Sequence, residues 1–280
     1  MPIAHLADRA LVRVAGPDAE HFLQNIVTAD LDQLGEGKAR PSALLTPQGK
    51  ILFDFLVSRD GPGAFVLDVR ADVADDFMRR LMLYRLRAKV EIAKRDQAIV
   101  AVSWDAESAT GLRDMRFAEL DVRRAQVAQP PAESDMDAWT RLRIAHGVAE
   151  SGADYELGDA FPHDVLLDRN GGVGFRKGCY VGQEVVSRMQ HRGTARRRVL
   201  IVRADRDLPA PGTPLTVAGR PVGTLGSVAG RDGLAIARID KVADATRAGQ
   251  DVEADGVVVT LSIPAWAGFD FPAAAETEAD

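Results

Sequence analysis

An α+β fold followed by a small β-rich domain is predicted by three features of this sequence. Residues 10–104 combine short β-type runs with amphipathic helix patterns, in an order that favours an antiparallel-rich sheet. From Arg198 onward, short β-runs recur at regular spacing between Gly, Pro and Asp turns, which predicts a small antiparallel barrel or sandwich. No Gly-x-Gly-x-x-Gly or P-loop motif stands at a strand–helix junction, so nucleotide binding of those kinds is unsupported.

The first half of the chain contains strands, one hairpin and two helices. Residues 10–15 alternate like a strand that ends at Gly16-Pro17, and Asp18 is a candidate N-cap for a short helix. Pro47-Gln48-Gly49 separates two apolar runs and therefore predicts a hairpin with a long second arm. The remaining elements expected before residue 105 are strands at 64–70, 89–94 and 98–104 and a helix at 72–86 that buries Val73, Phe77, Leu81 and Tyr84.

The middle of the chain contains one helix and a long irregular segment. Ser134 or Asp135 can cap a helix that runs to about His146. Trp139 and Arg143 lie one turn apart on this helix, where the indole is either a core residue or a platform for a flat heterocycle with the arginine holding an acid group. Residues 147–175 are rich in glycine, which is typical of binding loops or linkers.

These patterns predict three regions. Residues 1–195 are expected to form an α+β domain of two subdomains, with their boundary near 95–130. Residues 196–266 are expected to form the C-terminal β-barrel. Residues 267–280 are rich in Ala and Glu without periodicity, so we expect a disordered tail.

Composition excludes several classes of protein. No apolar run reaches the ~18 residues that a membrane span needs, and the first residues resemble neither a secretory signal nor a transit peptide. One cysteine excludes an intrachain disulfide and fits a reducing compartment. The net charge of −6 argues against a general nucleic-acid binder.

Positive charge is nevertheless concentrated in one stretch. Between Arg176 and Arg198 there are seven cations and one acid, Glu184. This stretch is either a solvated basic face or a surface for an anionic partner. No aromatic residues are interleaved with the arginines from Arg188 to Arg198, so an RNA-binding module is disfavoured.

The same stretch begins with the only cysteine. Cys179 lies in the run Lys177-Gly178-Cys179-Tyr180-Val181-Gly182-Gln183-Glu184. Its neighbouring glycines permit a tight turn or a close approach to another group. Nearby cations favour the thiolate, which is both the nucleophile and the metal ligand. A purely structural cysteine more often lies in an apolar strand or helix.

This run, followed by Arg188, resembles the signature of the YgfZ-type folate-binding proteins, relatives of the glycine-cleavage aminomethyltransferase or T-protein. The other landmarks of the resemblance, in family order, are residues 22–30, Pro47-Gln48-Gly49-Lys50, Arg143 to Gly147, and Gly193 to Arg198. The resemblance implies a T-protein-like ring of ferredoxin-like α+β subdomains around a central channel, plus the barrel.

The resemblance also implies a function. The ligand would be tetrahydrofolate or a derivative, and the role would be accessory: maturation of iron–sulfur proteins, mainly four-iron four-sulfur enzymes, with a link to tRNA modification. Its partners would be client or assembly proteins, without direct nucleic-acid or membrane binding. A bacterial member would be cytoplasmic and a eukaryotic one would lie in the mitochondrial matrix.

The resemblance assigns roles to particular residues. Cys179 is the functional centre, with Lys177 beside it as the second candidate catalytic residue. Asp164 and Trp139 would meet the pterin, and Arg143 or the cations at 188–198 would bind the glutamate tail. The further candidate folate contacts are Asp30, Tyr180, Gln183, Glu184 and Arg188. Two departures are an Asp at 164 where T-proteins have Glu, and Asp8-Arg9-Ala10 where some relatives carry a Trp.

Alternatives remain for the chemistry. Cys179 could act as a nucleophile or ligate iron, but one cysteine cannot hold a cluster alone, and neither His163 nor His191 has metal-motif spacing. We therefore expect no stably bound metal and a partner that supplies the other ligands. The alternative function is a folate-dependent aminomethyl- or methyltransferase with Asp30 or Asp54 as acid or base; a cysteine hydrolase lacks a supporting triad.

Overall fold

The computed structural model describes residues 2–105 and 110–273. The chain divides into two compact units. The first unit comprises Met1–Trp139, Leu157–Pro162 and Leu167–His191, and the second comprises Thr140–Glu156, His163–Leu166 and Arg192–Asp280. The last segment of the second unit begins at Arg192, whereas the sequence analysis places the start of the barrel at residue 196. Two short stretches before it, at 140–156 and 163–166, group with the barrel.

The first unit is built on one nine-stranded sheet in the order β1-β7-β9-β8-β3-β4-β5-β2-β6. All neighbouring strands pair antiparallel except β3 and β8, which pair in parallel through Lys38 and Ala39. The predicted antiparallel-rich α+β class is therefore confirmed. The strands are β1 (Ile3–His5), β2 (Arg9–Ala15), β3 (Lys38–Leu45), β4 (Ile51–Arg59), β5 (Ala64–Arg70), β6 (Glu91–Lys94), β7 (Ile99–Ser103), β8 (Leu112–Asp114) and β9 (Arg123–Val127).

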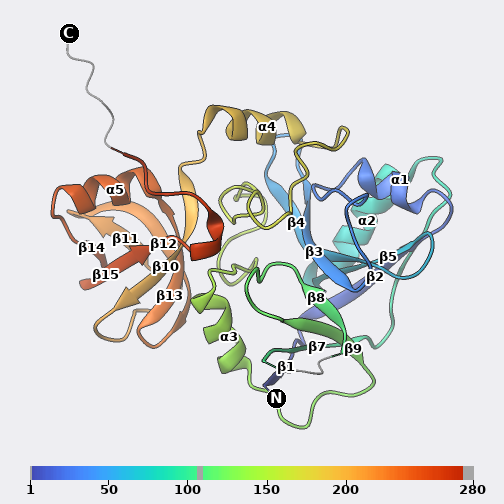
Figure 1. Ribbon diagram of the computed structural model, residues 1–280, viewed down its shortest axis with the longest axis horizontal. Coiled ribbons are helices and arrows are strands. Elements are labelled where there is room, and N and C mark those ends of the chain that lie inside the picture. Colours follow the sequence, from blue (N-terminus) through green and yellow to red (C-terminus); the bar gives the residue numbers. More distant parts are fainter. Residues whose placement is uncertain (1, 106–109, 274–280) are drawn as a thin grey trace. The chain divides into compact units, whose positions relative to one another are not determined.

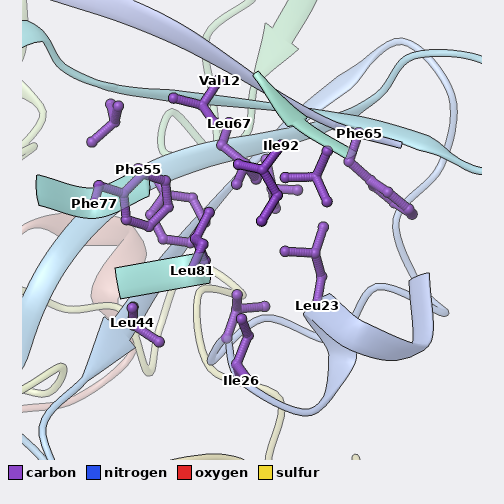
Figure 2. Packing of buried hydrophobic residues seen from close by; sticks show 14 of the residues in the cluster. Val12, Leu23, Ile26, Leu44, Phe55, Phe65, Leu67, Phe77, Leu81 and Ile92 are labelled. Carbon is purple, nitrogen blue, oxygen red and sulfur yellow. The ribbon is translucent and has the colours of Figure 1, made fainter. Parts of the chain in front are cut away.

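One face of strands β2, β4 and β5 packs against helices α1 (Ala19–Gln24) and α2 (Ala74–Arg85) (Figure 1). Alternate residues of each strand point to this face, as the two-residue period of a strand requires. Figure 2 shows Val12, Phe55 and Leu67 from the strands meeting Phe77 and Leu81 from α2. The Phe77 ring centre lies 5.0 Å from that of Phe55. A short 3₁₀ turn, η1 (Ala71–Val73), precedes α2.

Buried ion pairs join distant strands of this sheet. Asp68 on β5 accepts from Arg9 on β2 and from Arg124 on β9, and Arg124 also donates to Asp114 on β8. Burial alone would raise the pKa of Asp68, but the guanidinium groups of Arg9 and Arg124 hold that pKa below its usual value. The same balance, with Arg116 and Arg124, lowers the pKa of Asp114. Both carboxylates are therefore charged and paired inside the unit.

The second unit contains the barrel that the sequence predicts. Its strands close in the order β10-β13-β12-β11-β14-β15, all antiparallel. Gly223 lies where a Cβ would come 2.6 Å from that of Ala237, so the strands approach closely there. Helix α5 (Ile239–Arg247), which was not predicted, packs Val242 and Ala245 onto the barrel core (Figure 1). The strands are β10 (Arg197–Ala204), β11 (Pro214–Val217), β12 (Arg220–Ala229), β13 (Asp232–Arg238), β14 (Val252–Ala254) and β15 (Val257–Ser262).

The end of the chain differs in part from the predicted tail. A 3₁₀ turn, η2 (Ala265–Ala267), follows the barrel, and Phe269 and Phe271 pack against the barrel core. Two aromatic side chains bury enough apolar area to order this stretch. The rest of the predicted tail, 274–280, lies outside the described residues. Among the residues that are described, no helix is both long and apolar enough to cross a membrane.

Two further helices carry predicted site residues. Helix α3 (Met136–Ala145) occupies the predicted stretch before Gly147. In its first turn, Ala138 N donates to the carboxylate of Asp135, 2.7 Å, so Asp135 caps the helix. Helix α4 (Gln183–Arg192) begins at the last two residues of the cysteine run and was not predicted from the sequence. It forms the middle of the basic stretch at 176–198.

Candidate functional site

The segment that precedes Cys179 is fixed to the bend that begins at Thr28 in the first unit. The Thr28 hydroxyl donates to the Gly172 carbonyl, 2.6 Å, and Gly174 N donates to the Thr28 carbonyl, 2.8 Å. Thr28 is fully buried. A Cβ on Gly174 would come 2.9 Å from both the Asp30 Cβ and the Lys177 Cδ, so glycine is required for this close packing.

Lys177 forms the next anchor. Its ammonium donates to the carbonyls of Val27 and Ala29, at 2.7 and 2.8 Å. Burial lowers its pKa to about 8, against the opposing effect of Asp30 and Asp32. The ammonium also lies 5.3 Å from the ring centre of Tyr180. Lys177 therefore holds the loop in place. The two carbonyls that its ammonium binds belong to residues 148 and 150 positions earlier in the sequence.

After the cysteine, the loop packs tightly on the β3–β4 hairpin. Gly182 has a φ of +80°, and a Cβ there would lie 2.5 Å from the Thr46 carbonyl. Gly49 in the hairpin has a φ of +81°, and a Cβ on it would lie 2.9 Å from the Cβ of Val185 on α4. Both contacts require glycine for conformation and for space. The predicted Pro47-Gln48-Gly49 hairpin thus supports the start of α4.

Cys179 lies between these two anchors and is exposed. The neighbouring Gly178 differs from Gly174 and Gly182, because a Cβ on it would meet no described atom within 4 Å. Tyr180 on the other side is buried, and burial raises the pKa of its phenol. The loop therefore offers the thiol from a fixed backbone with open space beside it.

Asp30 is held by two glutamines rather than by a cation. Its carboxylate accepts from Gln24 Nε2 and Gln33 Nε2, both at 2.8 Å, and the side chain is nearly buried. It also accepts from Asp32 N at 3.3 Å, which closes a turn at this residue. Gln24 and Gln33 were not singled out from the sequence, because exposed and structural glutamines look alike in one chain.

The predicted site residues on α4 lie at its first two turns. Gln183 N donates to the Tyr180 carbonyl at 3.2 Å. Glu184 and Arg188 form an exposed ion pair one turn apart. These charges are accessible to a ligand or partner, and their pairing adds little to stability.

Trp139 is a core residue in the described conformation. Its side chain is 1% exposed, and its ring centre lies 5.9 Å from that of Trp104 and 5.6 Å from that of Phe117. The Arg124 guanidinium lies 5.9 Å from the same ring. Stacking of a pterin on this indole would require the aromatic cluster to open.

In the second unit, Arg143 is engaged by neighbours of that unit. Its guanidinium donates to the Asp154 carboxylate, the Val148 carbonyl and the Ser227 hydroxyl, at 2.9, 3.0 and 3.0 Å. Asp154 also accepts from the backbone N–H groups of Glu150 and Ser227. Asp154 is thus an organising residue that sequence reasoning missed, since carboxylates in glycine-rich loops usually form turns.

Asp164, also in the second unit, is buried, and its carboxylate lies 3.8 Å from Arg197 Nε. The Asp164 carbonyl accepts from Val199 N, 2.8 Å, which ties this residue to β10. No group of three His, Cys, Asp or Glu side chains that could hold a metal occurs among residues 2–105 and 110–273.

Two family models match this chain. Residues 6–104 match the GCVT N-terminal domain, and residues 196–269 match the CAF17 C-terminal beta-barrel domain. The mitochondrial iron–sulfur cluster assembly factor IBA57 of Mus musculus is 30% identical over 93% of this chain and 84% of its own length. The homologue from Pyricularia oryzae is 32% identical over 89% of this chain and 75% of its own.

This chain belongs to the IBA57/CAF17 family of iron–sulfur cluster assembly factors. The resemblance drawn from the Cys179 run is therefore confirmed. Among solved structures, the glycine cleavage system aminomethyltransferase T from Bartonella henselae superposes with a TM-score of 0.70, covering 95% of this chain and 86% of that one. At 16% identity, this likeness shows that the family member shares the aminomethyltransferase fold.

The two glycines around Cys179 should respond differently to substitution. Gly182→Ala should lower the free energy of unfolding by about 1–3 kcal/mol, because the new Cβ meets the Thr46 carbonyl at a positive φ. Gly178→Ala is the matched control and should stay within about 0.5 kcal/mol of the original. Urea unfolding measures both. Equal losses in the two variants would contradict the anchored-loop geometry.

Lys177 should make stability depend on pH at alkaline values. Its pKa falls from 10.5 in the unfolded chain to about 8 in the folded one, so between these values the unfolded chain holds more protons. Raising the pH from about 8 to about 10.5 should therefore stabilise the original chain relative to Lys177→Met, by roughly 1–3 kcal/mol. Unfolding titrations across this range measure it; parallel curves for the two chains would contradict it.

Proposed function

We propose that this protein is an accessory factor in the maturation of iron–sulfur proteins, mainly those with four-iron four-sulfur clusters, and that it acts through Cys179. The observation that carries the proposal is an exposed thiol on a loop whose two ends are fixed by Lys177 and Gly182. Family membership supplies the process, since the relatives are described as iron–sulfur cluster assembly factors. Iron–sulfur tRNA-modifying enzymes are among the clients that we propose.

The thiol would work together with a second protein. Iron–sulfur clusters normally bind four protein ligands, whereas this chain offers one cysteine and no metal-holding group among the described residues. A cluster in transit would thus be held by Cys179 and by ligands of an assembly or client protein. The open space next to Gly178 would let that protein approach the sulfur closely. A second role, in which the thiolate carries sulfur or a one-carbon group, uses the same exposure.

We also propose that the protein binds tetrahydrofolate. The match to the GCVT N-terminal domain supports this, and so does the chemistry of the candidate residues. A carboxylate such as Asp164 suits the N–H donors of a pterin, and a guanidinium such as Arg188 suits the carboxylates of the glutamate tail. Trp139, Arg143 and Asp164 are buried, so a folate that uses them would have to displace their present neighbours. The sharing of a cluster between Cys179 and a partner does not depend on the folate.

An aminomethyltransferase activity is the weaker alternative. The solved aminomethyltransferase is 16% identical to this chain. A likeness at that level shows a common fold but is no evidence for a common reaction. Asp54, its candidate acid or base, lies on β4 and is half-buried. Incubation with tetrahydrofolate and an aminomethyl donor, followed by assay for methylene-tetrahydrofolate, would separate the two functions.

Replacing the thiol should abolish function without loss of fold. In a deletion strain under oxidative stress, Cys179→Ser should fail to restore the activity of four-iron four-sulfur enzymes. Its thermal midpoint should equal that of the original chain, because the side chain is exposed. Ser187→Ala, on the neighbouring helix, is the control and should restore activity. Full restoration by Cys179→Ser would remove Cys179 from the mechanism.

Conservative substitutions should locate the folate. Asp164→Asn and Trp139→Phe avoid the core cavity that alanine would leave at these buried sites. In calorimetry with tetrahydrofolate, each should weaken binding about tenfold, the cost of one lost polar or stacking contact. Normal affinity in both variants would move the folate away from these residues. An original chain that does not bind tetrahydrofolate would remove the folate and leave the Cys179 experiment valid.

A further inference from the structure

The C-terminal end of α2 exposes large apolar side chains. Met82, Leu83 and Leu86 are 46%, 69% and 87% exposed, and all three lie within a stretch of five residues. The opposite side of the helix already packs Phe77 and Leu81 into the core. Single exposed apolar residues are ordinary, but a contiguous group of large ones marks an interaction site more often than chance.

Leu86 adopts a backbone conformation that leucine normally avoids. Its φ is 45° and its ψ is −106°, which corresponds to the second residue of a type II′ turn. The turn is closed by a hydrogen bond from Ala88 N to the Arg85 carbonyl, 2.7 Å. Glycine is the favoured residue at this position, because a Cβ is strained there. The leucine side chain is exposed, so packing within the chain does not offset the strain.

The turn is held in place by its neighbours. A Cβ on Gly16 would lie 2.3 Å from the Lys89 carbonyl, so the two backbones are in close contact. Lys89 N also donates to the Asp18 carboxylate at 2.7 Å. The position of Leu86 is thus fixed before any partner arrives, and a partner would bind without first ordering it.

Positive charge surrounds this apolar group. Residues 79–89 contain Arg79, Arg80, Arg85, Arg87 and Lys89 and no acid, within a chain of net charge −6. Arg79 pairs with Asp76, while Arg80, Arg85 and Arg87 form no ion pair among residues 2–105 and 110–273. Asp75, Asp76 and Glu91 lie close to this stretch in sequence, and the Asp18 carboxylate accepts from Lys89 N.

A hollow of about 530 Å³ adjoins the turn, lined by Ala15, Gly16 and residues 85–91. A projecting leucine beside a hollow matches the relief of a protein surface better than that of a flat lipid surface. The cations are mainly arginines, which protein interfaces favour over lysines. These features select a protein partner over a membrane.

We propose that Met82, Leu83, Leu86 and the arginines 80, 85 and 87 form a docking surface for an acidic protein segment that carries apolar side chains. Apolar side chains of that segment pack on Met82, Leu83 and Leu86, and its carboxylates pair with the arginines. The residues that form this surface are distinct from those around Cys179, and the proposal stands whether or not Cys179 acts in cluster maturation.

A short fluorescein-labelled peptide that alternates glutamate with leucine and phenylalanine tests this surface. Fluorescence anisotropy should show saturable binding that weakens as salt is added. A matched peptide with glutamine for glutamate should bind at least about tenfold more weakly, since it lacks the charge pairing. Absence of binding by the acidic peptide, or equal binding of both peptides, would overturn the proposal.

Leu86→Gly separates docking from folding. Glycine accepts the turn conformation, so the thermal midpoint should rise, while affinity for the acidic peptide should fall by about tenfold or more. Arg85→Glu with Arg87→Glu should remove binding, and Val258→Ser, an exposed apolar site on β15, should leave it unchanged. Unchanged affinity in Leu86→Gly would overturn the proposal.

Phosphatidylglycerol vesicles and a single-stranded RNA provide two competing arms. Neither should bind through this surface as tightly as the acidic peptide does. Tighter binding of vesicles, lost in Leu86→Gly, would replace the protein partner with a membrane. Tighter binding of RNA, lost in the double arginine variant, would replace it with a nucleic acid.

Discussion

The contact between Gly182 and the β3–β4 hairpin is the constraint on which the site depends. Two backbones approach closely there because neither Gly49 nor Gly182 carries a side chain, and both adopt positive φ. This contact fixes the start of α4 on the sheet, while Lys177 fixes the preceding segment through two carbonyls. An exposed cysteine on an unsupported loop would sample many positions. The two anchors restrict the backbone on both sides of Cys179 and therefore the positions that its sulfur can reach.

Buried electrostatics give the sheet a comparable rigidity. Asp68 and Asp114 share Arg124, so strands β5, β8 and β9 are linked through charged groups away from water. Each carboxylate also has a second arginine, Arg9 for Asp68 and Arg116 for Asp114, so the pairing does not depend on Arg124 alone. Such a network contributes less to net stability than to uniqueness, since alternative strand registers would separate its charges.

Much of the fold could be predicted because local patterns carry it. The turn at Pro47-Gln48-Gly49, the helix around Phe77 and the C-terminal barrel all follow from period and turn chemistry. Helices α4 and α5 were not predicted although both are amphipathic, because they span only ten and nine residues beside segments that were interpreted as loop or strand. The geometry around Cys179 could not be predicted. Lys177 lies two residues before Cys179 in sequence, yet its partners are carbonyls about 150 residues away. Likewise, sequence cannot distinguish the required Gly182 from the unconfined Gly178.

The exposure of a single cysteine has a consequence for the protein in an oxidising environment. With no second thiol in the chain, a disulfide at Cys179 must join it to another molecule, whether a second copy, a partner or a small thiol such as glutathione. Each of these adducts would cover the sulfur and is reversible by reduction. Because the thiol is exposed, the fraction of the protein that keeps it free therefore depends directly on the redox state of the compartment.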